Sequence, residues 1–67
     1  MNFQKRFCEA LLQTELQQKE IAEKCGINPS CITQYKTGES EPTLNTLYNL
    51  CRVMGVSADY LLGLSEI

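Results

Sequence analysis

The sequence predicts an all-α domain made of five short helices over residues 1–67. Apolar residues recur at spacings of three and four in successive segments, which is the pattern of helices with one buried face. Each of the four glycines follows such a segment, where a residue without a side chain can end a helix. A chain of 67 residues with 43% hydrophobic residues can form one small core. We therefore expect a single compact domain.

The first helix is predicted over residues 2–13. Phe3 and Phe7 are spaced to lie on one face and to anchor the core, with Ala10 or Leu11 continuing that face. This helix is expected to pack across the rest of the domain.

The second and third helices meet at a tight glycine turn within residues 16–38. Residues 17–25 place apolar side chains on one side of a helix, and Gly26 ends it because glycine adopts positive φ without a steric clash. Asn28 is a good N-cap and Pro29 suits the first helical position, where no backbone N–H is needed. In the third helix Ile32 and Tyr35 are predicted to face inward.

The fourth helix is predicted to begin after the N-cap Thr43 and to run to about Met54. Gly55 ends it, Ser57 caps a fifth helix, and that helix covers residues 58–62. The residues expected to face the core from the fourth helix are Leu44, Leu47, Leu50, Cys51 and Met54.

The outward face of the third helix is uncharged and polar, with Ser30, Thr33, Gln34 and Thr37. Side chains of these types can form hydrogen bonds with base edges, and glutamine suits a bidentate contact with adenine. A solvated helix face has the same composition, so the pattern alone leaves both interpretations open.

The order of residue types over most of the chain resembles the Cro/CI-type (XRE-like) helix-turn-helix family of phage and bacterial repressors. The matching residues are Leu16, Gln17, Gln18, Glu20, Ile21, Ala22, Gly26, Ile27, Asn28, Ser30, Ile32, Tyr35, Gly38, Pro42, Leu44, Leu47, Gly55 and Val56. The resemblance implies a lambda-repressor-like fold and sequence-specific binding of double-stranded DNA. The expected biological role is that of a transcriptional repressor or regulator acting as a dimer, with the third helix in the major groove.

The resemblance also implies roles for individual residues. The expected base contacts are Pro29, Ser30, Thr33, Gln34 and Thr37. The expected phosphate contacts are Gln17, Gln18, Lys19, Asn28, Lys36 and, through backbone amides, Gly38. The last helix commonly forms a two-fold dimer in this family, so a self-interface is expected to include Tyr60, Leu61, Leu64 and Ile67. Packing of these four residues against the first helix is the alternative.

The charge of the chain is unusual for a DNA-binding protein. Its formal net charge is −2, with only six basic residues, and the segment after Gly38 carries Glu39 and Glu41. Affinity for a duplex depends largely on cations that replace counterions at phosphates. A protein-interaction module on the same fold, with weak or no DNA binding, is therefore the second hypothesis.

An enzyme, a metal site and a cofactor are not expected. The chain has no histidine, no glycine-rich phosphate loop and no clustered carboxylates. Its four cysteines form no CxxC pair, which disfavours zinc, although a disulfide framework stays open. The chain has no apolar run of about 20 residues and begins with a polar segment, so a cytoplasmic protein without membrane insertion is expected.

Overall fold

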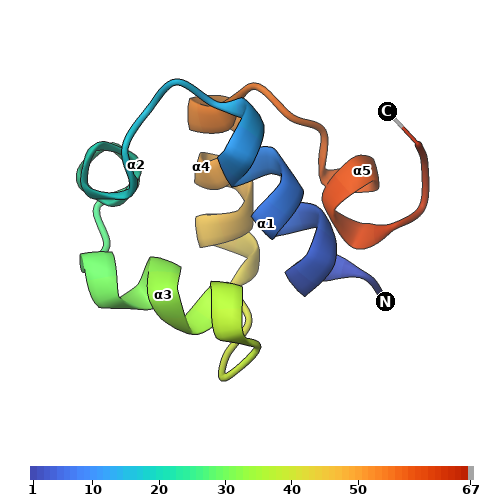
Figure 1. The fold of residues 1–67 in the computed structure, drawn as a ribbon, viewed down its shortest axis with the longest axis horizontal. Coiled ribbons are helices and arrows are strands. Elements are labelled where there is room, and N and C mark those ends of the chain that lie inside the picture. The colour runs from blue at the N-terminus through green and yellow to red at the C-terminus, as the bar shows by residue number, and fades with distance from the viewer. Residues whose placement is uncertain (67) are drawn as a thin grey trace.

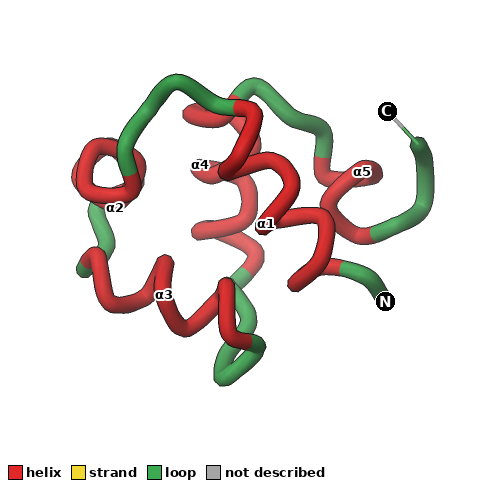
Figure 2. Tube along the Cα trace, viewed as in Figure 1, coloured by secondary structure: helices red, strands yellow, loops and turns green. Residues whose placement is uncertain are grey.

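A computed structural model describes residues 1–66 as five α-helices joined by short loops (Figures 1 and 2). The helices are α1 (Phe3–Gln13), α2 (Gln18–Cys25), α3 (Pro29–Thr37), α4 (Leu44–Met54) and α5 (Ala58–Leu62). The predicted all-α architecture is confirmed, with Asn2 and Gln17 standing just outside their helices as N-cap residues. In residues 1–66 no helix combines the length and the apolar character needed to cross a bilayer.

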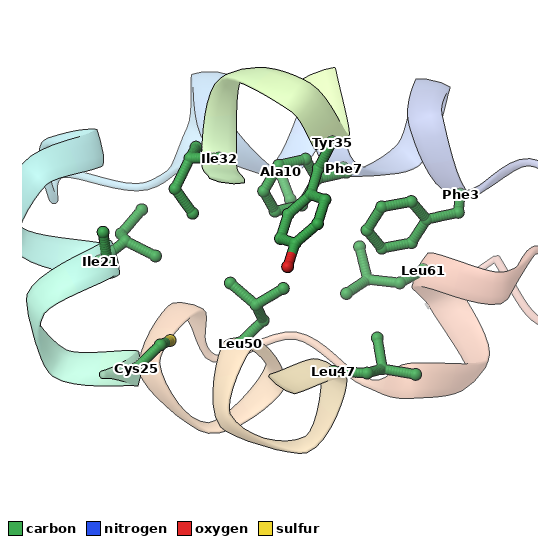
Figure 3. Packing of buried hydrophobic residues seen from close by; sticks show 11 residues of the cluster. Phe3, Phe7, Ala10, Ile21, Cys25, Ile32, Tyr35, Leu47, Leu50 and Leu61 are labelled. Carbon is green, nitrogen blue, oxygen red and sulfur yellow. The ribbon is translucent and has the colours of Figure 1, made fainter. Parts of the chain in front are cut away.

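The core is a single apolar cluster to which every helix contributes (Figure 3). The Phe3 and Phe7 rings stack with centroids 5.2 Å apart, and the Tyr35 ring meets both edge-on at 6.3 and 6.0 Å. These aromatic contacts fasten α3 to α1 beneath the polar face of α3. The buried residues are Phe3, Phe7, Ala10, Ile21, Ala22, Cys25, Ile32, Tyr35, Leu47, Leu50 and Leu61.

One residue of the predicted α4 stripe is not in the core. Leu44 is 85% exposed, because it is the first residue of α4 and lies beyond the cluster, whereas Leu47 and Leu50 are buried one and two turns later. The expectation of an inward Leu44 is therefore wrong. Cys51 and Met54 lie half-buried against the edge of the cluster.

The turn between α2 and α3 is fixed by backbone geometry. Gly26 has φ +70°, in the left-handed region, and the following Ile27 amide donates to the Ala22 carbonyl at 3.0 Å. Beyond the turn, Asn28 Oδ1 accepts a hydrogen bond from the Ser30 amide at 2.9 Å and so caps α3. These bonds hold α2 and α3 in one relative orientation.

Helix α5 and the segment after it are attached to α1. The Tyr60 hydroxyl donates to Glu9 Oε2 at 3.1 Å, and the Arg6 guanidinium stacks on the Tyr60 ring. Arg6 also donates to the Ser65 carbonyl at 3.2 Å and pairs with Glu66 at 3.5 Å. In Figure 1, α5 therefore lies beside α1 on the side of the domain away from α2 and α3.

Candidate nucleic-acid interface

The outward face of α3 is a continuous exposed surface of small polar groups. Ile32 and Tyr35 are buried on its inner side, while Cys31 and Lys36 are half-buried on its flanks. No charge interrupts the outward face. Its exposed members are Pro29, Ser30, Thr33, Gln34 and Thr37, which are the five predicted base contacts.

The amino end of α3 has few free backbone donors. Pro29 has no N–H, the Ser30 amide donates to Asn28 Oδ1, and the Cys31 amide donates to the Asn28 carbonyl at 2.9 Å. A ligand at this end would therefore be bound by side chains. With its oxygen engaged in the cap, Asn28 offers its side-chain NH₂ as the remaining donor.

The carboxyl end of α3 is closed by its own backbone and by Thr37. The Thr37 hydroxyl donates to the Gln34 carbonyl at 3.2 Å and accepts from the Glu39 amide at 3.4 Å. The Gly38 amide also donates to the Gln34 carbonyl. The helix cap thus already uses the hydrogen of this amide, and the phosphate contact of Gly38 stays a prediction. Thr37 likewise has no hydroxyl hydrogen left for a base.

Two side chains of α1 bind the same helix end. Gln4 Nε2 donates to the Lys36 carbonyl at 3.0 Å, and the Cys8 thiol lies 3.6 Å from that oxygen. The Lys36 side chain itself is half-buried. Its backbone is thus tied to α1, while its ammonium is the one cation on α3.

The amino end of α2 carries the other predicted phosphate contacts. Gln17 and Lys19 are exposed and Gln18 is half-buried at the start of the helix. The Gln17 amide donates to Glu20 Oε1 at 3.3 Å. First-turn amides of a helix have no partner within it, and the positive end of the helix dipole favours an anion there.

Negative charge lies next to the polar face of α3. Glu39 and Glu41 are both exposed in residues 38–43, which follow α3 directly. Of the basic residues, Arg6 is bound to residues 65–66 on the far side of the domain, so it does not offset them. The charges on and directly after α3 are therefore one cation, Lys36, and two exposed carboxylates.

The four residues predicted for a self-interface differ in their exposure. Leu61 is completely buried in the core of its own chain, so its assignment to a dimer contact is wrong. Tyr60 is half-buried against α1, as the alternative supposed, and Leu64 is 75% exposed. Ile67 lies outside the described residues.

One contact at the site was not foreseen from the sequence. Ser40 Oγ donates to Gln34 Oε1 at 3.4 Å, so a loop residue touches the central side chain of the polar face. Ser40 lies six positions beyond Gln34, and no helical spacing connects a loop residue with a helix residue. The sequence indicated only that a short polar residue, Ser40, follows closely after Gly38, the glycine that ends the third helix.

The cysteines form no disulfide, and all four are free thiols. Burial raises the pKa of the Cys25 thiol and of the Cys51 thiol. Residues 1–66 contain no group of three or more cysteine, aspartate or glutamate side chains arranged to hold a metal ion. The Cys25 and Cys51 thiols therefore behave as small apolar side chains.

Two short helices joined by a glycine turn, the second one exposing a polar face, define a helix-turn-helix protein. Residues 9–61 match the helix-turn-helix family model HTH_3, and the chain belongs to this family, whose type is that of Cro and CI. The curated relatives of the chain are HTH-type transcriptional regulators.

Three relatives from Bacillus subtilis (strain 168) illustrate the similarity. The HTH-type transcriptional regulator ImmR is 37% identical over 67 residues, which is 100% of this chain and 53% of that protein. The uncharacterized regulator YqaE is 42% identical over 75% of this chain and 43% of its own length. The SPbeta prophage-derived regulator YonR is 40% identical over 67% of this chain and 42% of its own. The chain thus spans about half the length of these relatives. No solved structure matches it.

Proposed function

We propose that this protein is a transcriptional regulator that binds double-stranded DNA sequence-specifically, with α3 in the major groove. The observation that carries the proposal is the exposed, uncharged polar face of α3, held in place by Ile32 and Tyr35 in the core. A helix of this size fits the major groove, where each base pair presents a distinct pattern of donors and acceptors. The names of the relatives, all HTH-type transcriptional regulators, support the same function.

The base contacts proposed are those with free functional groups. Ser30, Thr33 and Gln34 donate to or accept from base edges, and Pro29 makes an apolar contact, for example with a thymine methyl group. Thr37 contributes less, because its hydroxyl closes the helix end. Specificity is thus concentrated in the first two turns of α3.

Phosphate contacts are proposed at both helix starts. Gln17, Gln18 and Lys19 lie at the amino end of α2, where Gln17 and Glu20 form a capping box, and Asn28 offers its side-chain NH₂. Lys36 adds one cation near the end of α3. With so few cations, the dependence of affinity on salt is expected to be shallow compared with that of strongly basic DNA-binding proteins.

We propose that two copies bind DNA together, since one neutral recognition surface gives little affinity alone. A two-fold dimer would place the two copies of α3 roughly 34 Å apart, about one turn of DNA. The residues proposed for the contact are Ile67, the exposed Leu64 and the half-buried Tyr60. In sedimentation experiments Leu64→Asp should weaken self-association by about 10- to 100-fold. Leu12→Asp, at a leucine 87% exposed on α1, is the matched control. Equal association of wild type and Leu64→Asp would contradict this surface.

The acidic segment favours one alternative. Glu39 and Glu41 are exposed beside α3, and carboxylates there repel phosphates. A protein partner with basic side chains would instead be attracted to this face. The alternative function is therefore a protein-interaction module on the same fold, with weak or no DNA binding.

A titration with a labelled random duplex separates the two functions. Fluorescence anisotropy at about 50 and 200 mM salt should show binding that weakens at the higher salt. Selection of bound sites from a random DNA pool should then yield a preferred sequence with repeated half-sites. No binding at the lower salt would contradict DNA binding and favour the protein-interaction module.

A further inference from the structure

We propose that Ser40 is a positioning residue that restrains the side chain of Gln34 over the α3 face and thereby sharpens its choice of base. This inference rests on the proposed function, because it concerns how the α3 face discriminates between base pairs. Ser40 itself need not touch DNA.

Four groups after α3 converge on Gln34, and the first is the Gly38 amide, which donates to the Gln34 carbonyl. The Glu39 and Ser40 amides donate to the Gln34 carbonyl at 3.0 and 3.4 Å, and Ser40 Oγ donates to Gln34 Oε1 at 3.4 Å. The two amides fix the loop against the helix end. The hydroxyl of Ser40 is then within reach of the Gln34 side chain because the backbone has already placed it there.

The loop is itself held against α1. Gly38 has φ +84°, which turns the chain back on the helix, and a Cβ at this position would lie 2.8 Å from Gln4 Oε1. Ser40 is half-buried in the turn, whereas Gln34 is exposed. Because the Gln34 side chain is exposed, the hydrogen bond from the Ser40 hydroxyl is the contact that we propose to order it.

Orientation matters because the two ends of the amide differ. Oε1 accepts hydrogen bonds and Nε2 donates them, and a rotation by 180° exchanges the two. Adenine presents an N7 acceptor beside an N6 donor, while guanine presents two acceptors, N7 and O6. The Ser40 hydroxyl donates to Oε1 on the side of the loop, which leaves Nε2 and the second lone pair of Oε1 for the groove, and this order suits the acceptor and donor of adenine. Because a hydroxyl can also accept from Nε2, the contact restrains the position of the side chain rather than the order of its two ends.

A Gln34 side chain without this contact would sample more positions over the α3 face, and it would lose side-chain entropy on binding that the wild type has already lost. Removal of the hydroxyl should therefore lower discrimination at one base pair by about 2- to 10-fold, without changing affinity for random duplex.

The first test compares Ser40→Ala with Ser40→Thr, which keeps a hydroxyl. Sites selected from a random DNA pool should show a weaker preference at a single base pair for Ser40→Ala, the same pair that Gln34→Ala affects. Ser40→Thr should retain the wild-type preference. Wild-type discrimination by Ser40→Ala, or an equal loss at every position, would overturn the proposal.

The second test needs no DNA and so separates this proposal from the proposed function. In the free protein, NMR relaxation of the Gln34 side-chain NH₂ group should show faster motion in Ser40→Ala than in wild type or Ser40→Thr. The Gln18 side-chain NH₂ should be unchanged and serves as the internal reference. Equal Gln34 mobility in the three proteins would overturn the proposal, even if the wild type binds DNA.

Discussion

The Arg6 guanidinium lies 4.7 Å from the centre of the Tyr60 ring and joins the first helix to the last. The Tyr60 hydroxyl donates to Glu9 Oε2, so one aromatic side chain bridges a cation and a carboxylate of α1. Burial, followed by the hydrogen bond to Glu9, raises the pKa of Tyr60. These contacts place α5 without involving the α3 surface, so stability and DNA contact can be tested separately.

Arg6→Ala should destabilise the protein by about 1–2 kcal/mol, through loss of the cation–π contact and of the hydrogen bond to the Ser65 carbonyl. For a domain of this size that corresponds to a fall in Tm of roughly 4–8 °C per kcal/mol. Thermal unfolding followed by circular dichroism measures it. Lys5→Ala, at an exposed position of the same helix, is the control and should change Tm little. Equal Tm values for the two variants would contradict the role of Arg6.

Asn28 should combine a structural and a binding role that two substitutions can separate. Asn28→Ala removes the acceptor of the Ser30 amide and should cost about 1 kcal/mol in urea unfolding. Asn28→Asp keeps the acceptor and should retain stability. The added negative charge should nevertheless weaken binding to every DNA sequence. Full DNA affinity in Asn28→Asp would exclude Asn28 from the phosphate contacts.

Most of the fold could be predicted from the sequence because helix ends are encoded locally. Gly26 and Asn28 stand side by side with the helices that they end and begin, and their geometry follows from their own chemistry. The exposure of Leu44 could not be predicted in the same way. Helical spacing gives the face on which a residue lies, but not the point along the axis where the core ends.

The site was predicted less completely, because hydrogen bonds between neighbouring segments decide which groups are free. The residue types on the α3 face were apparent from spacing, and all are exposed. The use of the Gly38 amide in the helix cap and the contact of Ser40 with Gln34 depend on the path of the loop. Burial of Leu61 likewise depends on how α5 docks onto α1.

Gln34 and Lys36 should respond differently to replacement by alanine. Gln34→Ala should cost roughly 1–3 kcal/mol on the preferred site and relax the preference at one base pair. Lys36→Ala should weaken binding to all sequences alike and make the salt dependence shallower. Anisotropy titrations on selected and random duplexes at two salt concentrations measure both effects. An equal loss on every sequence for Gln34→Ala would show that α3 presents a different face to the bases.

Cys25 should make stability depend on alkaline pH. Burial raises the pKa of its thiol above the ordinary value of 9.0, so folding favours the protonated form. Its contribution is therefore complete below pH 9 and is lost as pH rises through the higher native pKa. Urea unfolding from pH 7 to 10.5 should show a steeper decline above pH 9 for wild type than for Cys25→Ala. Parallel curves for the two proteins over that range would contradict the effect of burial.

Gly38 and Gly26 should differ in their tolerance of alanine. Both have positive φ, but a Cβ at Gly26 would meet nothing within 4 Å, whereas at Gly38 it would lie 2.8 Å from Gln4 Oε1. Gly26→Ala should therefore cost about 1–2 kcal/mol in unfolding free energy from the backbone alone. Gly38→Ala should cost a further 0.5–1.5 kcal/mol or so, because Gln4 must move and lose its hydrogen bond to the Lys36 carbonyl.

A double-mutant cycle tests the cause of that difference. In a Gln4→Ala background the crowding atom and the hydrogen bond are both absent, so Gly38→Ala should cost only as much as Gly26→Ala. Urea unfolding of the single and double variants supplies the four free energies of the cycle. If Gly38→Ala costs as much unfolding free energy in the Gln4→Ala background as in wild type, the penalty comes from the backbone of the loop and not from Gln4. Because Gly38 places Ser40 beside Gln34, Gly38→Ala should also weaken base discrimination at the Gln34 position.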